Sequence, residues 1–410
     1  MKSSLQSKYS YYALSLLLAV NLFNYIDRQI IYAVFPLIKD AFRLTDTSLG
    51  FLGSAFMLCY MLSAPALGWL GDRMNRVRIA SAGLAVWSVA TSLSGLAASY
   101  SSLLMARISV GIGEASFGTV SPGLLCDYFS KEKRGRILSY FYLAIPVGSA
   151  LGYLLGGILG EKFGWQAAFL MVGLPGILLA IPLWFLHEPE RGATEQKVSA
   201  VALPAKTDYR SLFFNRPYII NTLAMTAMTF AMGGLAQWVP TFLYRIHELD
   251  LAHANTYFGT ITVVAGIAGT LVGGWLGDLL QEKMNRGYLV ISGWGFVIGA
   301  PLAVYALITP SVTTCLVAIF FAEFFLFLNT GPLNTVIINV TAPALRARAF
   351  AVNIFIIHAL GDAVSPAVLG WLSDHWGLRN ALLITPVALL AASVFCFLCG
   401  RFIGEESGQT

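Results

Sequence analysis

The feature that most constrains the fold of this chain is the recurrence of apolar stretches of about twenty residues along its whole length, each long enough to cross a bilayer as a helix. Inside lipid every backbone polar group must find a partner within the protein, so these stretches are predicted to be α-helices and not open sheets. Twelve spans are expected, near residues 11–35, 48–70, 79–98, 103–127, 136–159, 166–186, 217–244, 255–276, 288–308, 312–340, 349–372 and 379–403. The chain is therefore predicted to be an all-α membrane protein.

Composition and charge agree with a membrane protein and argue against a soluble domain or a nucleic-acid-binding protein. Of the 410 residues, 57% are hydrophobic and 11% are charged, whereas a soluble domain has about 25% charged residues. The net charge of +5 does not indicate nucleic acid, because nineteen of the 26 lysines and arginines fall on the side of the amino terminus and only five on the other. By the positive-inside rule both termini are expected in the cytoplasm. We expect a multi-pass protein of the bacterial inner membrane and a monomer, with no removable signal peptide.

Short phrases recur in the two halves of the chain. The longest polar interval divides the spans six and six, and the corresponding phrases lie 206, 212 and 213 residues apart. The pairs are Gly68–Asp72 with Gly274–Asp278, Arg134–Arg136 with Arg346–Arg348, and Gly164–Ala168 with Gly377–Ala381. We expect two pseudo-symmetric six-helix halves, residues 1–190 and 216–410, joined by a cytoplasmic linker at 191–215. Such a repeat is typical of alternating-access transporters, whose substrates bind near the bilayer midplane.

Ionisable residues inside two spans mark the candidate site. Asp27 and Arg28 follow each other two-thirds of the way along the first span, and the fourth span carries Arg107 and Glu114. These last two are seven residues apart, so they share a helix face about 10 Å apart along the axis. Intramembrane charges are expensive and usually functional, which predicts a proton- or substrate-handling site. The alternative is a set of charges that only locks helices together.

The family resemblance rests on several motifs. The phrase Gly68-x-Leu70-Gly71-Asp72-Arg73-x-Asn75-Arg76-x-Arg78 resembles the signature loop between spans two and three of the major facilitator superfamily, and with the twelve-span plan the resemblance covers the whole chain. Three further phrases resemble the Spinster family: Asn24–Arg28, Gly113–Ser116 and Tyr140–Ser149. The first phrase is shared with organic-anion:cation symporters related to hexuronate and galactonate carriers, so it does not separate the two families.

The resemblance implies a mechanism. Spans one and four face the central cavity in the superfamily, which would bring the four charged residues together. We expect Asp27 and Glu114 to couple transport to protons, and Arg28 and Arg107, with Asn24, to bind the head group of an anion. A guanidinium suits this because its planar fork binds phosphate or carboxylate through two hydrogen bonds. The implied substrate is an amphiphilic anion, such as a lysophospholipid or a sphingosine-phosphate-like lipid, and no cofactor is expected besides the proton.

The charged residues of the loop after span two indicate a gate. Its charges could pair with those after span four only when the cytoplasmic helix ends close, and so favour one of two states. The residues concerned are Asp72, Arg73, Arg76, Arg134, Arg136 and the repeated Asp278. The alternative is a positive-inside anchor whose exposed ion pairs contribute at most about 1 kcal/mol each.

The second half offers fewer ionisable groups in its spans. Glu323 on span ten lies near the depth of Glu114, and His358 and Asp362 on span eleven are four residues apart on one face. We expect these three to contact substrate. A histidine titrates near neutral pH, so His358 could also be a second proton site, or simply pack against a neighbouring helix.

Glycines spaced for close helix contact occur on spans five and eight. Both sets predict seams where two helices approach closely. They are Gly148, Gly152 and Gly156 on span five, and Gly266, Gly269 and Gly273 on span eight.

Two other functions remain open from the sequence. A symporter of a small organic anion such as a sugar acid would need amides near the arginines, for which Asn24, Gln237, Asn329 and Asn334 are candidates. A membrane sensor or scaffold that does not transport is the other. The pair Cys396 and Cys399 has no partner pair in the sequence, so no metal site is expected. No phosphate-binding glycine motif indicates an ATP-driven pump.

Overall fold

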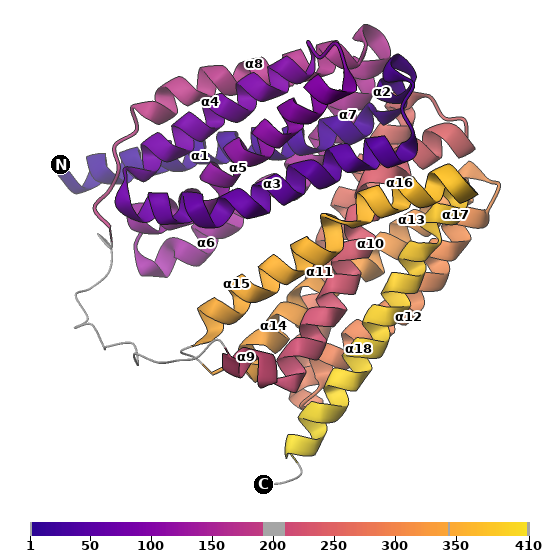
Figure 1. Cartoon of the computed structure of the whole chain (residues 1–410). Coiled ribbons are helices and arrows are strands. Elements are labelled where there is room, and N and C mark those ends of the chain that lie inside the picture. Colours follow the sequence, from indigo (N-terminus) through magenta and orange to yellow (C-terminus); the bar gives the residue numbers. More distant parts are fainter. Residues whose placement is uncertain (1, 192–209, 343–344, 408–410) are drawn as a thin grey trace. The chain divides into compact units, whose positions relative to one another are not determined.

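A computed structural model describes residues 2–191, 210–342 and 345–407 of the chain (Figure 1). The regular secondary structure of these residues is entirely helical, as the apolar stretches predict. Eleven of the described helical segments are long and apolar enough to cross a membrane. The segment α1 (Lys2–Ala33) precedes them and carries the polar residues Asn21, Asn24, Asp27 and Arg28 in its second half. With α1 the twelve expected spans are all present as helices.

The chain divides into two compact units. Unit 1 comprises residues 1–44, 55–201 and 250–259, and unit 2 comprises residues 45–54, 202–249 and 260–410. The helices of the first half are α1, α2 (Phe35–Phe42), α3 (Asp46–Arg73), α4 (Arg76–Ser94), α5 (Tyr100–Tyr128), α6 (Lys131–Tyr142), α7 (Ala144–Phe163) and α8 (Trp165–Trp184). Those of the second half are α9 (Arg210–Phe214), α10 (Arg216–Ile246), α11 (Leu251–Lys283), α12 (Gly287–Ile308), α13 (Val312–Phe327), α14 (Thr330–Val340), α15 (Arg346–Ile357), η2 (His358–Asp362), α16 (Ser365–Trp376), α17 (Leu378–Leu382) and α18 (Ile384–Ser407).

The two units do not coincide with the two halves of the sequence. The expected boundary places residues 45–54 in the first half and 250–259 in the second, whereas by contact each of these segments groups with the opposite unit. Both segments lie at or next to the start of a long helix, α3 and α11 respectively. Residues 192–209 of the expected linker lie outside the described residues. The domain limits at 190 and 216 stay predictions.

Several spans are interrupted helices. The fifth consists of α6 and α7, the tenth of α13 and α14, and the eleventh of α15, η2 and α16. The segment η2 is a π-helix. A π-helical turn is rare and occurs frequently at functional sites. The interruption in the eleventh span therefore falls on His358 and Asp362, two of the expected substrate contacts.

Each unit has its own apolar core, and glycines bring its helices close together. In unit 1, a Cβ at Gly148 or Gly152 would lie 2.8 or 2.7 Å from a carbonyl oxygen of α1. In unit 2, a Cβ at Gly273 would lie 1.9 Å from the carbonyl oxygen of Leu328, directly after α13. Real Cβ atoms do not approach this closely, so these contacts require glycine. The expected seam on span five is confirmed and fixes α7 against the part of α1 that carries Asp27 and Arg28. The seam on span eight is confirmed at Gly269 and Gly273, whereas a Cβ at Gly266 would make only ordinary contacts of 3.5 Å with the ring of Phe327.

Candidate functional site

The four charged residues expected to meet in spans one and four do meet, within unit 1. The Nε of Arg28 donates to Oε2 of Glu114 at 2.6 Å. The Nη1 of Arg107 donates to Oδ1 of Asp27 at 3.4 Å. Each pair joins α1 to α5, so neighbouring residues of α1 bind residues seven apart on α5.

The cluster is deeply buried. Asp27, Arg107 and Glu114 are at most 2% exposed, and the side chain of Arg28 is 16% exposed. Two carboxylates and two guanidinium groups balance each other in charge, which offsets the large cost of removing each charge from water. The site is therefore sensitive to substitution of any one of its charged residues, because the loss of one partner leaves the opposite charge buried and unpaired.

Several polar atoms of the cluster have no hydrogen-bond partner among the described residues. They are Nε and Nη2 of Arg107, Oε1 of Glu114 and Nδ2 of Asn24. Buried polar atoms are nearly always satisfied in native proteins, so a group of unsatisfied ones needs an explanation. Two guanidinium donors on Arg107 and one amide donor on Asn24 are the kind of group that binds an oxyanion.

Sequence reasoning missed Thr91, which completes the environment of Asp27. The hydroxyl of Thr91, on α4, donates to Oδ2 of Asp27. This carboxylate therefore has one partner on α4 and one on α5, and α1 is tied to both helices at this depth. A lone threonine in an apolar span gives no distinctive signal, and only the packing of α4 against α5 reveals its role.

Aromatic rings around the two guanidinium groups are a second missed feature. The Cζ atom of Arg28 lies 5.0 Å from the ring centre of Tyr25 and 4.8 Å from that of Tyr60. The ring of Phe56 lies between the two arginines, 5.4 Å from Cζ of Arg28 and 5.0 Å from Cζ of Arg107. Such contacts stabilise a buried cation. They hold both guanidinium groups in place, and Nε and Nη2 of Arg107 stay without a partner among the described residues.

A glycine explains how the ring of Phe56 reaches this position. A Cβ at Gly111, on α5, would lie 2.4 Å from the carbonyl oxygen of Phe56, on α3. The close approach of the two backbones requires glycine at this position, which lies between Arg107 and Glu114 in the sequence.

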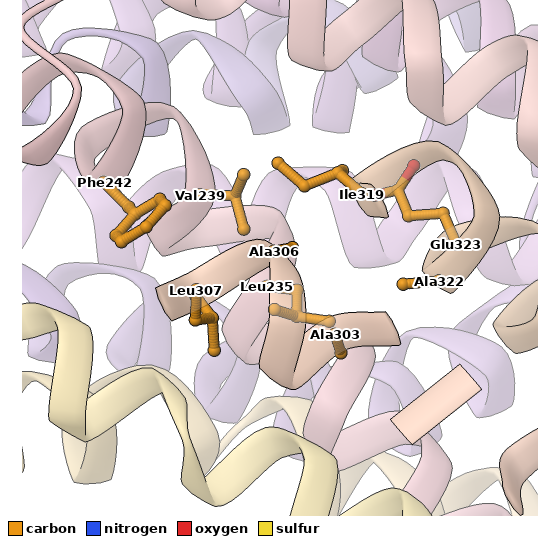
Figure 2. A pocket seen from close by; sticks show the side chains of 9 residues that line it. All are labelled: Leu235, Val239, Phe242, Ala303, Ala306, Leu307, Ile319, Ala322 and Glu323. Carbon is orange, nitrogen blue, oxygen red and sulfur yellow. The ribbon is translucent and has the colours of Figure 1, made fainter. Parts of the chain in front are cut away.

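The ionisable groups expected in the second half lie in unit 2, in two places. Glu323, on α13, borders a cavity of about 30 Å³ that is otherwise lined by apolar side chains of α10, α12 and α13 (Figure 2). Its Oε1 accepts a hydrogen bond from Thr262 at 3.1 Å, and its Oε2 has no partner among the described residues. No ion pair of the described residues includes it. Glu323 is thus a buried acid without a cation, unlike Glu114.

His358 and Asp362 form a pair inside the π-helical segment η2. The Nδ1 of His358 lies 2.9 Å from both carboxylate oxygens of Asp362. A Cβ at Gly233, on α10, would lie 2.5 Å from Cβ of Asp362. The expectation that the two residues share a face is confirmed, although the local helix is π rather than α. Their contact with substrate stays a prediction.

Around the loop after α3, the observed ion pairs of unit 1 centre on Arg76. Its Nη1 lies 2.7 Å from Asp127 and its Nε 2.7 Å from Glu188. Neither acid was expected from the sequence. Arg134 donates to the carbonyl of Cys126 at 3.1 Å, and the pairing of Asp72 with Arg134 or Arg136 stays a prediction.

Other expected gating residues have local partners. The guanidinium of Arg191 donates to the carbonyls of Gly71, Asp72 and Met74, at and just beyond the end of α3. In unit 2 the hydroxyl of Tyr288 donates to Asp278 at 2.6 Å. These contacts fix both repeated loops to their own unit.

Comparison with known proteins identifies the family. The model of the Major Facilitator Superfamily matches residues 17–366. The chain is 32% identical to Danio rerio spinster homolog 3 over 100% of this chain and 90% of that protein, and 33% identical to the Danio rerio sphingosine-1-phosphate transporter SPNS2 over 94% and 83%. The chain belongs to the Spinster family of the major facilitator superfamily. Drosophila melanogaster spinster is 33% identical over 89% of this chain, but the chain spans only 62% of that longer protein.

Solved structures agree with this assignment. A bacterial homologue of the human lysosomal transporter Spinster, inward-facing and unoccupied, has a TM-score of 0.89 and 26% identity, covering 97% of this chain and 98% of that chain. The D-xylose–proton symporter has a TM-score of 0.77 at 17% identity over 95% and 97%, which shows the shared fold alone. The Spinster-family protein is therefore a multi-pass membrane transporter of the major facilitator fold, and not an enzyme.

Proposed function

We propose that this Spinster-family protein is a proton-coupled secondary transporter of an amphiphilic anion, a lysophospholipid or a sphingosine-phosphate-like lipid. The single observation that carries the proposal is the buried, charge-balanced quartet of Asp27, Arg28, Arg107 and Glu114, in which Arg107 has unused donors. The name of the zebrafish relative, a sphingosine-1-phosphate transporter, supports a phosphate head group.

The quartet links anion binding to proton binding. An anionic head group that binds a guanidinium competes with the carboxylate already paired to it. The displaced carboxylate is left in a site from which water is largely excluded, where the neutral, protonated form costs far less than the charged one. Anion and proton therefore bind together rather than in competition, which favours their movement in the same direction.

Each residue has a proposed role in this scheme. Glu114 and Asp27 take up the protons, and Arg28 and Arg107 bind the head group, with Asn24 as a further donor. Glu323, His358 and Asp362 are proposed contacts for the rest of the substrate. The side chains around Glu323 are apolar, as the contacts of a hydrocarbon chain would be, although the cavity of about 30 Å³ that they line is only water-sized in this structure.

The amides do not favour the sugar-acid alternative. Asn334 donates to the carbonyl of Thr330 and Asn329 to that of Phe325, each at 2.7 Å, while Oδ1 of Asn329 has no partner among the described residues. Gln237 has an Oε1 without a partner in the described residues. The amides do not decide between the two substrates, and the lipid anion is kept because the zebrafish relative is named a sphingosine-1-phosphate transporter.

Orientation and cofactor follow from the same proposal. We infer that the protein works as a monomer in the bacterial inner membrane, with both termini in the cytoplasm because positive charges concentrate on that side. The proton is the only coupling ion proposed, and no nucleic acid or metal partner is proposed.

Uptake into proteoliposomes tests the proposal. Labelled lysophospholipid and sphingosine 1-phosphate are offered with and without an inward proton gradient, and a labelled sugar acid serves as the competing substrate. We expect the gradient to stimulate lipid uptake, and Asp27→Asn and Glu114→Gln to remove that stimulation. Asp40→Asn, on the exposed surface of α2, is the matched control.

Three results would contradict the proposal. Gradient-driven uptake that survives both acid substitutions refutes the proton assignment. Sugar-acid uptake without lipid uptake refutes the substrate. The absence of all uptake, with lipid binding retained, identifies a sensor instead.

A further inference from the structure

A second cavity of unit 2 lies where four membrane spans begin or end. It has a volume of about 80 Å³ and lies between the turn that joins α11 to α12, the last turn of α14 and the last part of α18. The candidate spans with an end here are Leu251–Lys283, Gly287–Ile308, Val312–Val340 and Leu378–Ile403. The cavity therefore lies at a surface of the membrane, at the depth of the lipid head groups.

The polar wall of the cavity offers three side chains that bind nothing else in the described part of the chain. They are the guanidinium of Arg286 and the amides of Asn285 and Asn339. Of the described residues that line the cavity, one is cationic and none is acidic. The acids Asp278 and Glu282 of α11 are not among them, and Asp278 accepts a hydrogen bond from the hydroxyl of Tyr288 at 2.6 Å. The wall therefore suits an anion.

Hydrogen bonds and a glycine hold the turn that carries Arg286. The amide of Gln281 donates to the carbonyl of Asn285 at 3.0 Å, and its oxygen accepts from the backbone N–H of Tyr288 at 3.3 Å. A Cβ at Gly287 would lie 2.2 Å from the backbone nitrogen of Gln281, so the turn folds back on α11 as closely as glycine allows.

The aliphatic stem of Arg286 lies over a glycine of α18. A Cβ at Gly400 would meet Cδ and Cβ of Arg286 at 3.7 and 3.8 Å. The polar wall is therefore largely formed before a ligand binds, and an anion does not have to order the turn first.

Another part of the wall is apolar and leads into the membrane. Leu289 on α12 and Ile403 on α18 line the cavity. About 8–9 Å deeper along the same two helices, the ring centres of Trp294 and Phe397 lie 5.9 Å apart, with 55% and 36% of these residues exposed. An acyl chain that leaves the cavity along this seam would meet apolar side chains all the way.

A phospholipid has both of the parts that these walls fit. A guanidinium binds phosphate oxygens through two hydrogen bonds, and each amide adds a donor. The volume is several times the roughly 10–15 Å³ that one water molecule needs, which leaves room for a phosphate group. Free phosphate would use the polar wall alone and leave the apolar wall without a partner.

We propose that this cavity binds the phosphate of an anionic phospholipid of the surrounding membrane. Arg286 is the ion-pair partner of the phosphate, and Asn285 and Asn339 are further donors. One acyl chain lies along the rings of Trp294 and Phe397. The inference goes beyond the proposed function and does not depend on it, because the site holds a resident lipid and not the transported molecule, and all of its residues belong to unit 2.

Native mass spectrometry of the full-length protein, titrated with phosphatidylglycerol or with phosphatidylcholine of the same chains, tests the polar wall. We expect wild type to bind phosphatidylglycerol more tightly. Arg286→Gln should weaken that binding about fivefold, as the loss of one cation near the membrane surface predicts, and leave phosphatidylcholine unchanged. Arg379→Gln, which removes an exposed arginine at the other end of span twelve, is the matched control. Unchanged phosphatidylglycerol binding in Arg286→Gln overturns the proposal.

Competition distinguishes a lipid from a soluble phosphate. Inorganic phosphate and sn-glycerol 3-phosphate lack the chain and should not displace phosphatidylglycerol, so displacement by either one refutes the lipid. Trp294→Ala should weaken phosphatidylglycerol binding about threefold, as the loss of a few tens of Å² of apolar contact predicts. Trp275→Ala, on the exposed surface of α11, is the control for that variant. Equal binding by Trp294→Ala and wild type refutes the path of the acyl chain.

Thermal unfolding in detergent gives a second measurement that needs no variant. A ligand that binds the folded state raises the melting temperature, so phosphatidylglycerol should raise that of wild type more than phosphatidylcholine does. Equal stabilisation by the two lipids overturns the proposal. None of these measurements involves transport, so a failure of lipid uptake would refute the proposed function and leave this site untouched.

Discussion

A double-mutant cycle on Arg28 and Glu114 tests the central interaction of the candidate site. The two side chains meet at 2.6 Å with exposures of 16% and 0%. Removing one partner of a buried ion pair typically costs about 3–5 kcal/mol, because the other charge stays behind, whereas removing both is often close to neutral. We therefore expect about 3 kcal/mol of lost unfolding free energy in Glu114→Gln, a somewhat larger loss in Arg28→Gln, and no more than about 3 kcal/mol in the double variant.

The difference between the single and double variants gives the coupling energy, which we expect to be about 3 kcal/mol, at the upper end for residues in contact. The glutamine at position 114 keeps the shape of the side chain and one acceptor, so the loss reports charge rather than volume. The three aromatic rings around Arg28 retain part of its stabilisation in Glu114→Gln. That variant should therefore lose less than Arg28→Gln, in which the fully buried Glu114 has lost its partner.

Equilibrium unfolding in mixed micelles of increasing SDS fraction, followed by circular dichroism, measures these free energies. Glu323→Gln is the matched control, since Glu323 is also a buried acid on a membrane helix but takes part in no ion pair of the described chain. We expect that control to lose less than about 1 kcal/mol. Single-variant losses that add up within about 0.5 kcal/mol in the double variant would refute the reasoning, because they would show that the two charges do not depend on each other.

Three further predictions concern other parts of the two units. Arg107→Lys keeps the charge but loses the planar fork, so lipid uptake should fall about tenfold at normal expression, as measured in proteoliposomes. Gly233→Ala should lower unfolding free energy by about 1–3 kcal/mol through overpacking, whereas Gly274→Ala, with nothing within 4 Å of the new Cβ, should change it little; SDS unfolding distinguishes them. Burial, with a smaller effect of Arg379, lowers the pKa of His247, so the folded state binds this proton less readily than the unfolded chain. The resulting stability is complete above about pH 6.5 and is lost as pH falls below it, and unfolding of His247→Gln between pH 5 and 7.5 should lack that loss.

The fold was predictable because the bilayer restricts what an apolar stretch can form. Runs of about twenty apolar residues leave helices as the available structure, and the repeated phrase at Gly68 and Gly274 revealed the duplication. The core of the site was predictable for a related reason. Charges such as Asp27 and Glu114 are so costly in a span that their presence alone predicts that they meet.

Site residues that can be placed in a membrane span at little free-energy cost could not be predicted. Thr91 and Tyr60 are ordinary residues in membrane spans, and nothing in their spacing shows that they surround Asp27 and Arg28. Asp127 and Glu188 stand among other charges near helix ends, so their pairing with Arg76 depends on tertiary contacts. In a π-helical segment the backbone hydrogen bonds span one residue more than in an α-helix. The sequence of His358–Asp362 has no periodicity that predicts this change.

The repeat has preserved packing while the chemistry of the halves has diverged. Equivalent glycines such as Gly157 and Gly370 remain in both halves, because close helix contacts need glycine wherever they occur. Paired intramembrane charges concentrate in unit 1, whereas Glu323 in unit 2 has Thr262 and apolar walls as neighbours. A polar head and an apolar tail need just such unlike surfaces. If the divergence of the two halves provides the selectivity, substitutions at Arg107 should change the preference among head groups.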